Sequence, residues 1–472
     1  MPRIFFDVSD LRRHLQARRS VSGIQRVSLM VIDHAIAQAG PEDEIWLGFH
    51  DKRTKRYMAL RPKEMPGFVT GSPDAFALRL GMYPLEKSLP SMVKYKPDTA
   101  KYRFHLTVRR LNAAMGNEAH FRRRGLTIAD WQASLPDVSS ATSDTRPIAE
   151  IARAGDQLVV LGAFWDMPDP NAVFQPLADQ GLHISLMIHD LIPVIMPETV
   201  AYAHGLNFHE TLRRSVEFVG TYLANSTSTA SDLQTFLQTY GASQPVITVP
   251  LAQAGIGVDP ADGHVPDMVR HVDQSRYPRL VSAVGLTDQL RRIWRQPYVL
   301  CVGTRDTRKN IWRLAQAWAR MRQDASLELP KLVIAGGKGW GAEDFDQLMQ
   351  STGQLGGWVE IVDRPRDAEL AHLYRNCLFA VMPSLYEGWG LPIGEALAYG
   401  KTVVASETSS MPEVGGDLVV YCDPHSIESI RAACAGLLSD PARRQALETR
   451  IATTKLRSWG DVATDLVGHL GT

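Results

Sequence analysis

The sequence predicts an α/β fold made of two doubly wound domains, and three observations lead to that prediction. Short apolar runs alternate with longer amphipathic segments in both halves of the chain, a pattern typical of parallel sheets covered by helices. The chain has 472 residues, which exceeds the usual size of a single core. Its composition, with 44% hydrophobic and 22% charged residues, is that of a globular protein.

The elements follow one another in a regular order. In the N-terminal half we expect strands at 3–8, 44–49, 157–162, 183–189, 221–225 and 245–250, and helices at about 23–38, 199–219 and 228–240. In the C-terminal half we expect strands near 298–303, 331–336, 358–363, 378–383, 402–406 and 418–422, and helices near 310–323, 343–351, 367–376, 392–399, 426–437 and 441–454. The predicted domains are therefore 1–285 and 286–458, with a last helix within 459–472 that crosses back to the N-terminal domain. Two domains that face each other leave a cleft, a common position for a ligand.

The segment 63–150 breaks this alternation and is too long for a plain loop, so we interpret it as an insertion in the N-terminal domain. Helices are expected near 100–123 and 128–134. The part between 101 and 124 collects cations, with Glu118 as the acid among them: Lys101, Arg103, Arg109, Arg110, Arg122, Arg123 and Arg124. One interpretation is a peripheral contact with anionic lipid headgroups. The other is a solvated insertion whose arginines pair with acids elsewhere.

Charge and cysteine usage exclude several classes of protein. A formal net charge of zero argues against a nucleic-acid partner. The four cysteines (Cys301, Cys377, Cys422 and Cys434) lack Cys-x-x-Cys spacing and are expected to be reduced core residues. The N-terminus enters a strand directly, without a signal peptide, and no apolar run is long enough to span a bilayer. We expect a cytoplasmic protein that at most lies at the inner face of the cytoplasmic membrane.

The most informative stretch is a strand, a turn, a helix and a strand between 378 and 406. Gly388 and Gly390 let the backbone bend tightly and bring its N–H groups close to a ligand. Pro392 suits the first position of a helix whose unpaired N–H groups point into the same space. The turn 388–391, which includes Trp389 and Leu391, is therefore a receptor for an anion such as a diphosphate.

Two carboxylates flank this turn. Glu395, expected in the first turn of the helix, suits both hydroxyls of a ribose. Glu387, at the end of the strand, then faces the group beyond the phosphates, and together these features describe a nucleotide sugar. Two acids around a sugar also describe glycoside hydrolysis, but hydrolysis of a neutral glycoside needs no phosphate receptor.

Glu387 and Glu395, with seven residues between them, resemble the Glu-x7-Glu signature of retaining glycosyltransferases of the GT-B fold, family 4 (glycosyltransferase group 1), and in particular its mannosyltransferases. Similar blocks occur at 302–310, 335–340, 383–388 and 409–415, and more sparsely at 22–27 and 189–193. The resemblance implies a metal-independent hexosyltransferase with two Rossmann-like domains. It would move a hexose, mannose as the first guess, from a nucleotide-diphosphate sugar to a saccharide or lipid-linked acceptor in bacterial surface polysaccharide or lipopolysaccharide synthesis.

A second anion site is predicted at Arg308 and Lys309, beside the start of a helix near 310. Two fixed cations there suit a leaving diphosphate, whose charge grows as the glycosidic bond breaks. The family often carries an arginine at the position of Thr304, so Arg308 or Arg305 would have to replace it. Lys338 either lines the nucleotide pocket or is a solvated turn lysine.

Two predicted site residues lie in the N-terminal half. His189 ends an apolar strand, where it is expected to contact a sugar hydroxyl or to satisfy loop carbonyls. Gly23 lies in the loop after the first strand and resembles the glycine loop that the family places near the diphosphate, although ordinary turn glycines look the same.

No metal site is expected. The one Asp-x-Asp spacing, Asp344 and Asp346, lies at a polar helix start, where acids commonly complement the helix dipole. Two alternatives to a transferase stay open. One is another nucleotide-sugar enzyme such as an epimerase or a phosphorylase; the other is a non-catalytic nucleotide-sugar-binding subunit of a polysaccharide assembly complex.

Overall fold

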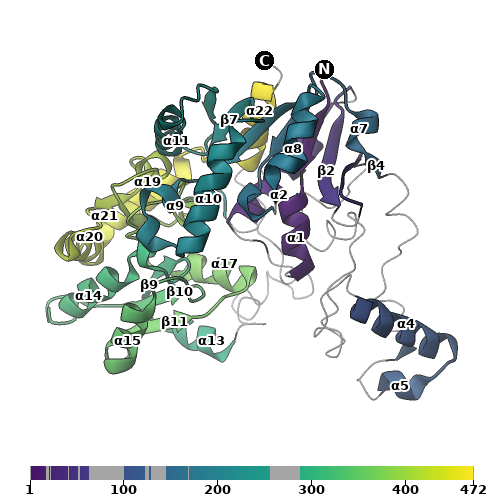
Figure 1. Cartoon of the computed structure of the whole chain (residues 1–472). Coiled ribbons are helices and arrows are strands. Elements are labelled where there is room, and N and C mark those ends of the chain that lie inside the picture. The colour runs from purple at the N-terminus through teal and green to yellow at the C-terminus, as the bar shows by residue number, and fades with distance from the viewer. Residues whose placement is uncertain are drawn as a thin grey trace. The chain divides into compact units, whose positions relative to one another are not determined.

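The computed structural model describes residues 2–17, 21, 23–40, 42–51, 54–62, 100–122, 127–128, 145–167, 169–255 and 287–470, without the side chains of residues 16, 17, 102 and 103 (Figure 1). Its contacts divide the chain into two compact units. The first unit contains residues 1–186, 217–220 and 470–472, and the second contains 187–216 and 221–469. The predicted domain boundary at 285/286 lies outside the described residues.

An eight-stranded sheet has the order β4-β3-β2-β1-β5-β6-β7-β8. Its strands are β1 (Ile4–Asp7), β2 (Ile45–Asp51), β3 (Arg56–Leu60), β4 (Arg146–Pro147), β5 (Gln157–Val160), β6 (His183–Ile188), β7 (Thr221–Ala224) and β8 (Val246–Thr248). β1 lies parallel to both β2 and β5, whereas β3 and β4 are antiparallel additions at the edge.

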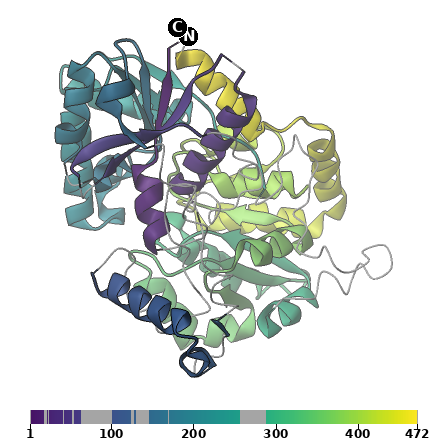
Figure 2. The same cartoon turned by 90° about the vertical axis from the view of Figure 1, so that its right-hand side faces the viewer.

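The helices of this half are α1 (Ser9–Ala17), α2 (Ile24–Gln38), α4 (Ala100–Ala114), α5 (Glu118–Arg122), α7 (Ile148–Ile151), α8 (Pro170–Asp179), α9 (Ile192–Ile195), α10 (Tyr202–Ser215) and α11 (Thr227–Thr239). α4 and α5 form a pair, drawn in dark blue in Figure 2. α11 starts at a side-chain cap, because the Ser226 hydroxyl accepts a hydrogen bond from Thr229 N.

A six-stranded, parallel sheet has the order β11-β10-β9-β12-β13-β14. Its strands are β9 (Tyr298–Val302), β10 (Lys331–Ala335), β11 (Val359–Val362), β12 (Ala380–Met382), β13 (Val403–Ser406) and β14 (Val420–Cys422). The helices of the C-terminal half of the chain are α13 (Asp288–Trp294), α14 (Ile311–Met321), α15 (Glu343–Ser351), α16 (Gly353–Gly357), α17 (Asp367–Asn376), α18 (Leu391–Ala398), α19 (Met411–Gly415), α20 (Ile427–Ser439), α21 (Pro441–Thr453) and α22 (Trp459–Leu470).

The core of this sheet is built around Trp318, which is fully buried and donates its indole N–H to Pro330 O at 3.1 Å. The order of the sheet determines where a ligand can lie. From β9 the chain first continues to β10 and β11 on one side and then to β12 on the other. Ligands bind at such a switch point, beyond the carboxyl ends of the two strands, so the loops after β9 and β12 are the candidate site.

Most sequence predictions of the fold are confirmed. The fold is α/β, each predicted strand is present within a few residues, and all four cysteines are buried and unbridged. The structure adds elements that were not predicted, namely α1, α7, α8, α9, α13, α16, α19, β3 and β4, and it divides the helix expected near 100–123 into α4 and α5. Residues 129–134 of the helix expected near 128–134 lie outside the described residues, as do Arg123 and Arg124.

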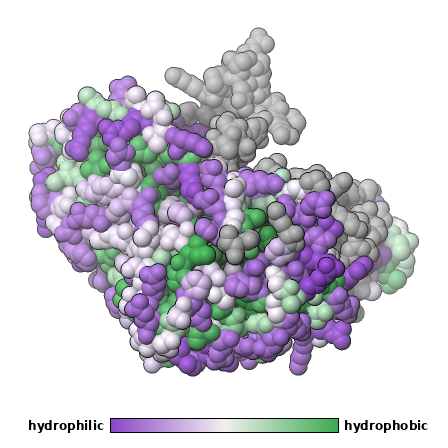
Figure 3. All heavy atoms as spheres, turned by 90° about the horizontal axis from the view of Figure 1, so that it is seen from above, coloured by the Kyte–Doolittle hydropathy of each residue, from purple (hydrophilic) through white to green (hydrophobic). Residues whose placement is uncertain are grey.

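The described part of the chain contains no helix with both the length and the apolar character required to cross a bilayer. On the face seen in Figure 3, hydrophilic side chains predominate and hydrophobic ones gather in limited patches, as is normal for a protein surface in water.

Candidate active site

The turns that follow β9 and β12 are joined directly. Leu385 N donates to Arg308 O at 2.8 Å, and the buried Asn310 donates its side-chain amide to Pro383 O at 2.9 Å. Asn310 has φ 59°, a left-handed conformation that an asparagine tolerates better than most residues. The two turns at the switch point therefore form one rigid unit.

One carboxylate oxygen of Glu387 forms ion pairs with both predicted cations, Arg308 and Lys309. Glu387 Oε1 lies 2.7 Å from a guanidinium nitrogen of Arg308 and 2.7 Å from Lys309 Nζ. Arg308 also donates to Tyr386 O at 2.8 Å. Glu387 is 7% exposed, so the three charges are largely withdrawn from water and screened little by salt.

The cations decide the charge of Glu387. Burial alone would raise the pKa of its carboxyl, but Arg308 and Lys309 outweigh burial and lower the pKa from its ordinary 4.5 to about 2. Burial would also lower the pKa of Arg308, and Glu387 together with Asp306 raises it instead. Glu387 and Arg308 are therefore charged at neutral pH.

The turn of residues 385–390, which we call the Glu387 turn, contacts the end of β6. A Cβ atom on Gly388 would lie 1.8 Å from the carbonyl oxygen of His189 and 2.8 Å from Cβ of Asp190, so no other residue fits there. His189 is 5% exposed. Burial raises the pKa of Asp190, and Arg308 nearby opposes that rise. The structure thus places the backbone of His189 against Gly388, the residue after Glu387, and adds Asp190, which was not singled out as a site residue. The contact of His189 with a sugar stays a prediction.

Glu395 occupies a different place from the one predicted. α18 begins at Leu391, not at Pro392, because Gly390 at φ 101° ends the turn. Glu395 is therefore the fifth helical residue, in the second turn, and the prediction that it lies in the first turn is wrong. It is 5% exposed, and its carboxylate accepts a hydrogen bond of 2.8 Å from the hydroxyl of Tyr374 on α17.

The remaining residues of the turn contribute backbone and packing. Trp389 is 6% exposed and donates its indole N–H to Ala252 O at 3.4 Å. A Cβ atom on Gly394 would lie 2.9 Å from Cα of Gln253. The side chain of Trp389 thus fixes the turn against the 251–255 segment, while Leu391 supplies the first helical residue of α18.

Three other predicted positions lie on the neighbouring loops. Thr304 is exposed, and its methyl group would lie 2.6 Å from a Cβ atom on Gly339. Lys338 pairs with Asp346 at 2.8 Å. Arg305 is buried and donates to Gly336 O at 2.6 Å and to Asp363 at 3.3 Å, so Arg308 is the arginine that faces Glu387.

Asp346, the second acid of the Asp-x-Asp spacing, is thus held in an ion pair. Among the described residues, no group of three or more histidines, cysteines and acids has the arrangement of a metal site.

Gly23 belongs to the first unit, whereas the other predicted site residues belong to the second. Gly23 caps α2 at φ 54°, and no atom lies within 4 Å of a Cβ built on it. Its role in binding a diphosphate stays a prediction.

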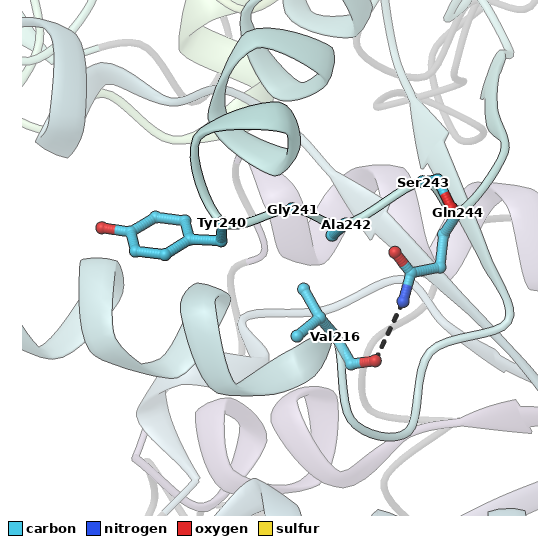
Figure 4. A pocket seen from close by; sticks show the side chains of 6 residues that line it. All are labelled: Val216, Tyr240, Gly241, Ala242, Ser243 and Gln244. Carbon is cyan, nitrogen blue, oxygen red and sulfur yellow. Dashed lines mark hydrogen bonds between the residues drawn. The ribbon is translucent and has the colours of Figure 1, made fainter.

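A surface hollow of the second unit lies elsewhere. Val216 and the loop of residues 240–244 line it, and Gln244 donates its side-chain amide to Val216 O at 2.9 Å, while the ring of Tyr240 points away (Figure 4). The loop precedes β8, at the amino end of a parallel strand. Ligands of such sheets bind at the opposite end, so this hollow is separate from the candidate site.

Sequence comparison identifies the part of the chain that carries the site. Residues 288–453 match the family model described as "Glycosyl transferases group 1". This part of the chain is a glycosyl transferases group 1 domain. It contains Arg308, Lys309, Lys338, Glu387 and Glu395.

Two curated relatives from Escherichia coli are mannosyltransferases by name. "O-antigen chain mannosyltransferase B" of Escherichia coli is 35% identical over 173 residues, which are 36% of this chain and 45% of that protein. "Serotype-specific mannosyltransferase WbdA" of Escherichia coli is 26% identical over 327 residues, 69% of this chain and 38% of that protein. The chain thus spans less than half the length of these two relatives.

Solved structures confirm the GT-B fold. Sucrose-phosphate synthase from Thermosynechococcus elongatus has a TM-score of 0.54 at 16% identity, covering 99% of this chain and 98% of that one. WaaG, "a glycosyltransferase involved in lipopolysaccharide biosynthesis", has a TM-score of 0.51 at 15% identity, covering 98% and 99%. The Anabaena protein Alr3699/HepE in complex with UDP and glucose has a TM-score of 0.53 at 13% identity, covering 100% of both chains.

Proposed function

We propose that this protein is a retaining mannosyltransferase that uses GDP-mannose as donor and a saccharide or lipid-linked acceptor in bacterial surface polysaccharide synthesis. The observation that carries the proposal is the convergence of Arg308 and Lys309 on one oxygen of Glu387 at the switch point between β9 and β12. The names of the Escherichia coli relatives support mannose as the transferred sugar and an O-antigen type of polysaccharide as the product.

Each part of the donor has a partner in this proposal. The amides of residues 388–391 and the N-terminus of α18 receive the diphosphate. Arg308 and Lys309 stabilise the negative charge that grows on it as the glycosidic bond breaks. Without a donor, Glu387 holds the two cations in place, so they need little reorganisation when the phosphates arrive. Glu387 then orients hydroxyls of the sugar, Glu395 binds the ribose, and His189 contacts the sugar.

The proposed transfer uses no protein nucleophile. The acceptor hydroxyl forms its bond to the anomeric carbon on the face from which the diphosphate leaves. The electron pair of the breaking bond passes to the diphosphate, and a phosphate oxygen takes the proton of the hydroxyl. We further propose that no divalent ion is required, because Arg308 and Lys309 supply the positive charge.

A ligand screen tests the proposal. We expect GDP and GDP-mannose to raise the melting temperature more than UDP, ADP, dTDP and their sugars, in buffer that contains EDTA. A ligand at 100 times its dissociation constant stabilises the folded state by about 2.7 kcal/mol. Release of GDP from GDP-mannose then measures turnover.

The outcomes of the screen separate the alternatives. Binding without turnover would favour the non-catalytic subunit. A response that appears only with magnesium or manganese would overturn the metal-free step. A larger shift with a uridine nucleotide would overturn the choice of GDP-mannose.

A membrane contact through α4 and α5 is the second part of the proposal. Phe104, Leu111 and Met115 are 65%, 59% and 63% exposed. A spacing of seven residues places Phe104 and Leu111 on one side of α4, and Met115 follows directly after the last residue of this helix. Lys101 and Arg110 are exposed on the same segment. Arg109, predicted as part of the basic face, is instead 5% exposed, so it does not contribute.

An apolar stripe with flanking cations suits an anionic lipid surface at the inner face of the cytoplasmic membrane. We expect the protein to sediment with vesicles of phosphatidylserine and phosphatidylcholine but less with phosphatidylcholine alone. The double variant Phe104→Ser/Leu111→Ser should reduce that binding about tenfold or more, whereas Leu206→Ser, which changes an exposed leucine of α10, should not. Equal binding of both variants would contradict this part of the proposal.

A further inference from the structure

The first turns of α11 contact the Glu387 turn from outside the group 1 domain. The hydroxyl of Tyr386 donates to Asp232 of α11 and lies 3.3 Å from the hydroxyl of Ser228. Thr229 donates its hydroxyl to Gly388 O at 3.3 Å. Residues on both sides of Glu387 are therefore hydrogen-bonded to one helix.

A second link connects the same two segments. Both carboxylate oxygens of Glu413 accept backbone N–H groups at the start of α11, from Thr227 at 2.7 Å and from Ser228 at 2.9 Å. A carboxylate at this position also complements the positive end of the helix dipole. Glu413 thus keeps the first turn of α11 beside the segment that supports Glu387.

Hydroxyl groups fix the Glu387 turn from the other side. Thr408 donates to Leu385 O at 3.0 Å, and Ser409 accepts from Glu387 N at 2.9 Å. Ser410 donates to the carbonyl oxygens of both Glu387 and Trp389 at 2.9 Å. The backbone of the turn is therefore held between these hydroxyls and α11.

Tyr386 is the residue that joins α11 to the proposed catalytic groups. Its carbonyl oxygen accepts from Arg308, its side chain donates to Asp232, and the next residue is Glu387. We propose that Asp232 and Tyr386 are positioning residues that hold the peptide before Glu387, and with it the Arg308–Glu387 pair, in the orientation needed for transfer. This inference rests on the proposed transferase function.

The chemistry of the contact supports a specific role. A hydroxyl that donates to a carboxylate makes a charge-assisted bond, stronger than one between neutral groups. Burial raises the pKa of Asp232, Tyr386 lowers it, and Asp190 nearby adds to the rise. Removing the hydroxyl of Tyr386 would leave Asp232 without this hydrogen bond, and the ring of Tyr386 would lose the contact that fixes its orientation.

Four variants test the inference. Tyr386→Phe and Asp232→Ala each remove the contact between the two side chains, whereas Asp232→Asn keeps an acceptor for the Tyr386 hydroxyl. Tyr240→Phe is the control, because it also removes a tyrosine hydroxyl, but at the far end of α11. We expect Tyr386→Phe and Asp232→Ala each to lower kcat for GDP release from GDP-mannose about tenfold, with KM nearly unchanged. The double variant Tyr386→Phe/Asp232→Ala should lower kcat no further than either single variant, because both changes remove the same contact. Asp232→Asn should recover most of the rate, and Tyr240→Phe should behave as wild type.

Hydrogen exchange supplies a readout that needs no turnover. Amides of residues 385–390 should exchange about tenfold faster in Tyr386→Phe than in the wild type or Tyr240→Phe. A wild-type protein that releases no GDP would count against the transferase function, while faster exchange would still support the positioning contact. An active wild type whose Tyr386→Phe variant keeps its kcat, or unchanged exchange at 385–390, would overturn the inference.

Discussion

Glu387 and Glu395 belong to one sequence motif and are similarly buried, at 7% and 5% exposure, yet their surroundings differ. Glu387 lies in the turn after β12 and accepts hydrogen bonds from two cations. Glu395 lies inside α18 and accepts from the neutral hydroxyl of Tyr374. The first acid is held by charge and the second by a helix and a phenol.

This difference indicates that the two carboxylates have different roles. A carboxylate that neutralises a cation pair determines how those cations meet a leaving diphosphate, so we expect Glu387 to affect the rate of transfer. A carboxylate held by a helix and a neutral partner presents a fixed acceptor, so we expect Glu395 to affect the affinity for the donor. Variants that change one carboxylate or its partners at a time test this division.

The largest effect is expected from Glu387→Gln on stability. Because folding lowers the pKa of Glu387 from 4.5 to about 2, its ion pairs stabilise the protein above pH 4.5, and that contribution is lost as the pH falls toward 2. The variant should therefore be less stable than the wild type at pH 7 by about 3 kcal/mol, an upper estimate from linkage. Urea unfolding from pH 7 to pH 3 measures the difference, which should shrink below pH 4.5.

Glu428→Gln is the matched control, because its ion pair with Arg431 is exposed. It should change stability little at any of these pH values. A Glu387→Gln variant as stable as the wild type at pH 7 would show that the cation pair does not depend on this carboxylate.

Lys309→Ala comes next. Loss of one fixed charge beside the leaving diphosphate should lower kcat about 100-fold, which corresponds to about 2.7 kcal/mol. Lys338→Ala removes a lysine that pairs with Asp346 at the surface and should leave kcat within about twofold. Initial rates of GDP release from GDP-mannose provide the measurement, and similar losses from both variants would contradict the role of Lys309.

The smallest effects concern Glu395. Glu395→Ala should weaken GDP binding about tenfold and Tyr374→Phe about threefold, since the second change leaves the carboxylate in place and removes one hydrogen bond. Isothermal titration measures both affinities. Tyr298→Phe, which removes a buried phenol that donates to Leu373 O, should bind GDP as the wild type does. A large loss of kcat with unchanged GDP affinity in Glu395→Ala would reverse the assignment.

Much of the fold and part of the site could be predicted from sequence. Arg308 and Lys309 lie in the loop after one apolar strand, and Glu387 lies in the turn after another. The carboxyl ends of parallel strands meet at one edge of a sheet, so the proximity of these residues follows from the local pattern. The predicted start of the helix that carries Glu395 is one residue late, because a proline suits either the first or the second helical position and the backbone geometry at Gly390 decides between them.

Other features left no local signal. α8 contains Pro176 inside the helix, which normally argues against one. α1 is a short helix rich in charged residues, and its apolar face consists of only two leucines, Leu11 and Leu15. Asp232 reaches Tyr386 from 154 positions away, a contact that only the packing of α11 creates. Glu413 was noted within a family-like block, but its partners at the start of α11 were not predictable from that block.

The central claim is that backbone amides of residues 388–391, together with Arg308 and Lys309, bind the diphosphate of a nucleotide sugar. A crystal structure of the protein soaked with GDP-mannose in the absence of divalent ions tests it most directly. We expect the diphosphate to lie at the start of α18, within hydrogen-bond distance of Arg308 or Lys309, with the ribose at Glu395. A diphosphate bound elsewhere on the protein, with these groups left in contact with Glu387 and solvent, would contradict it.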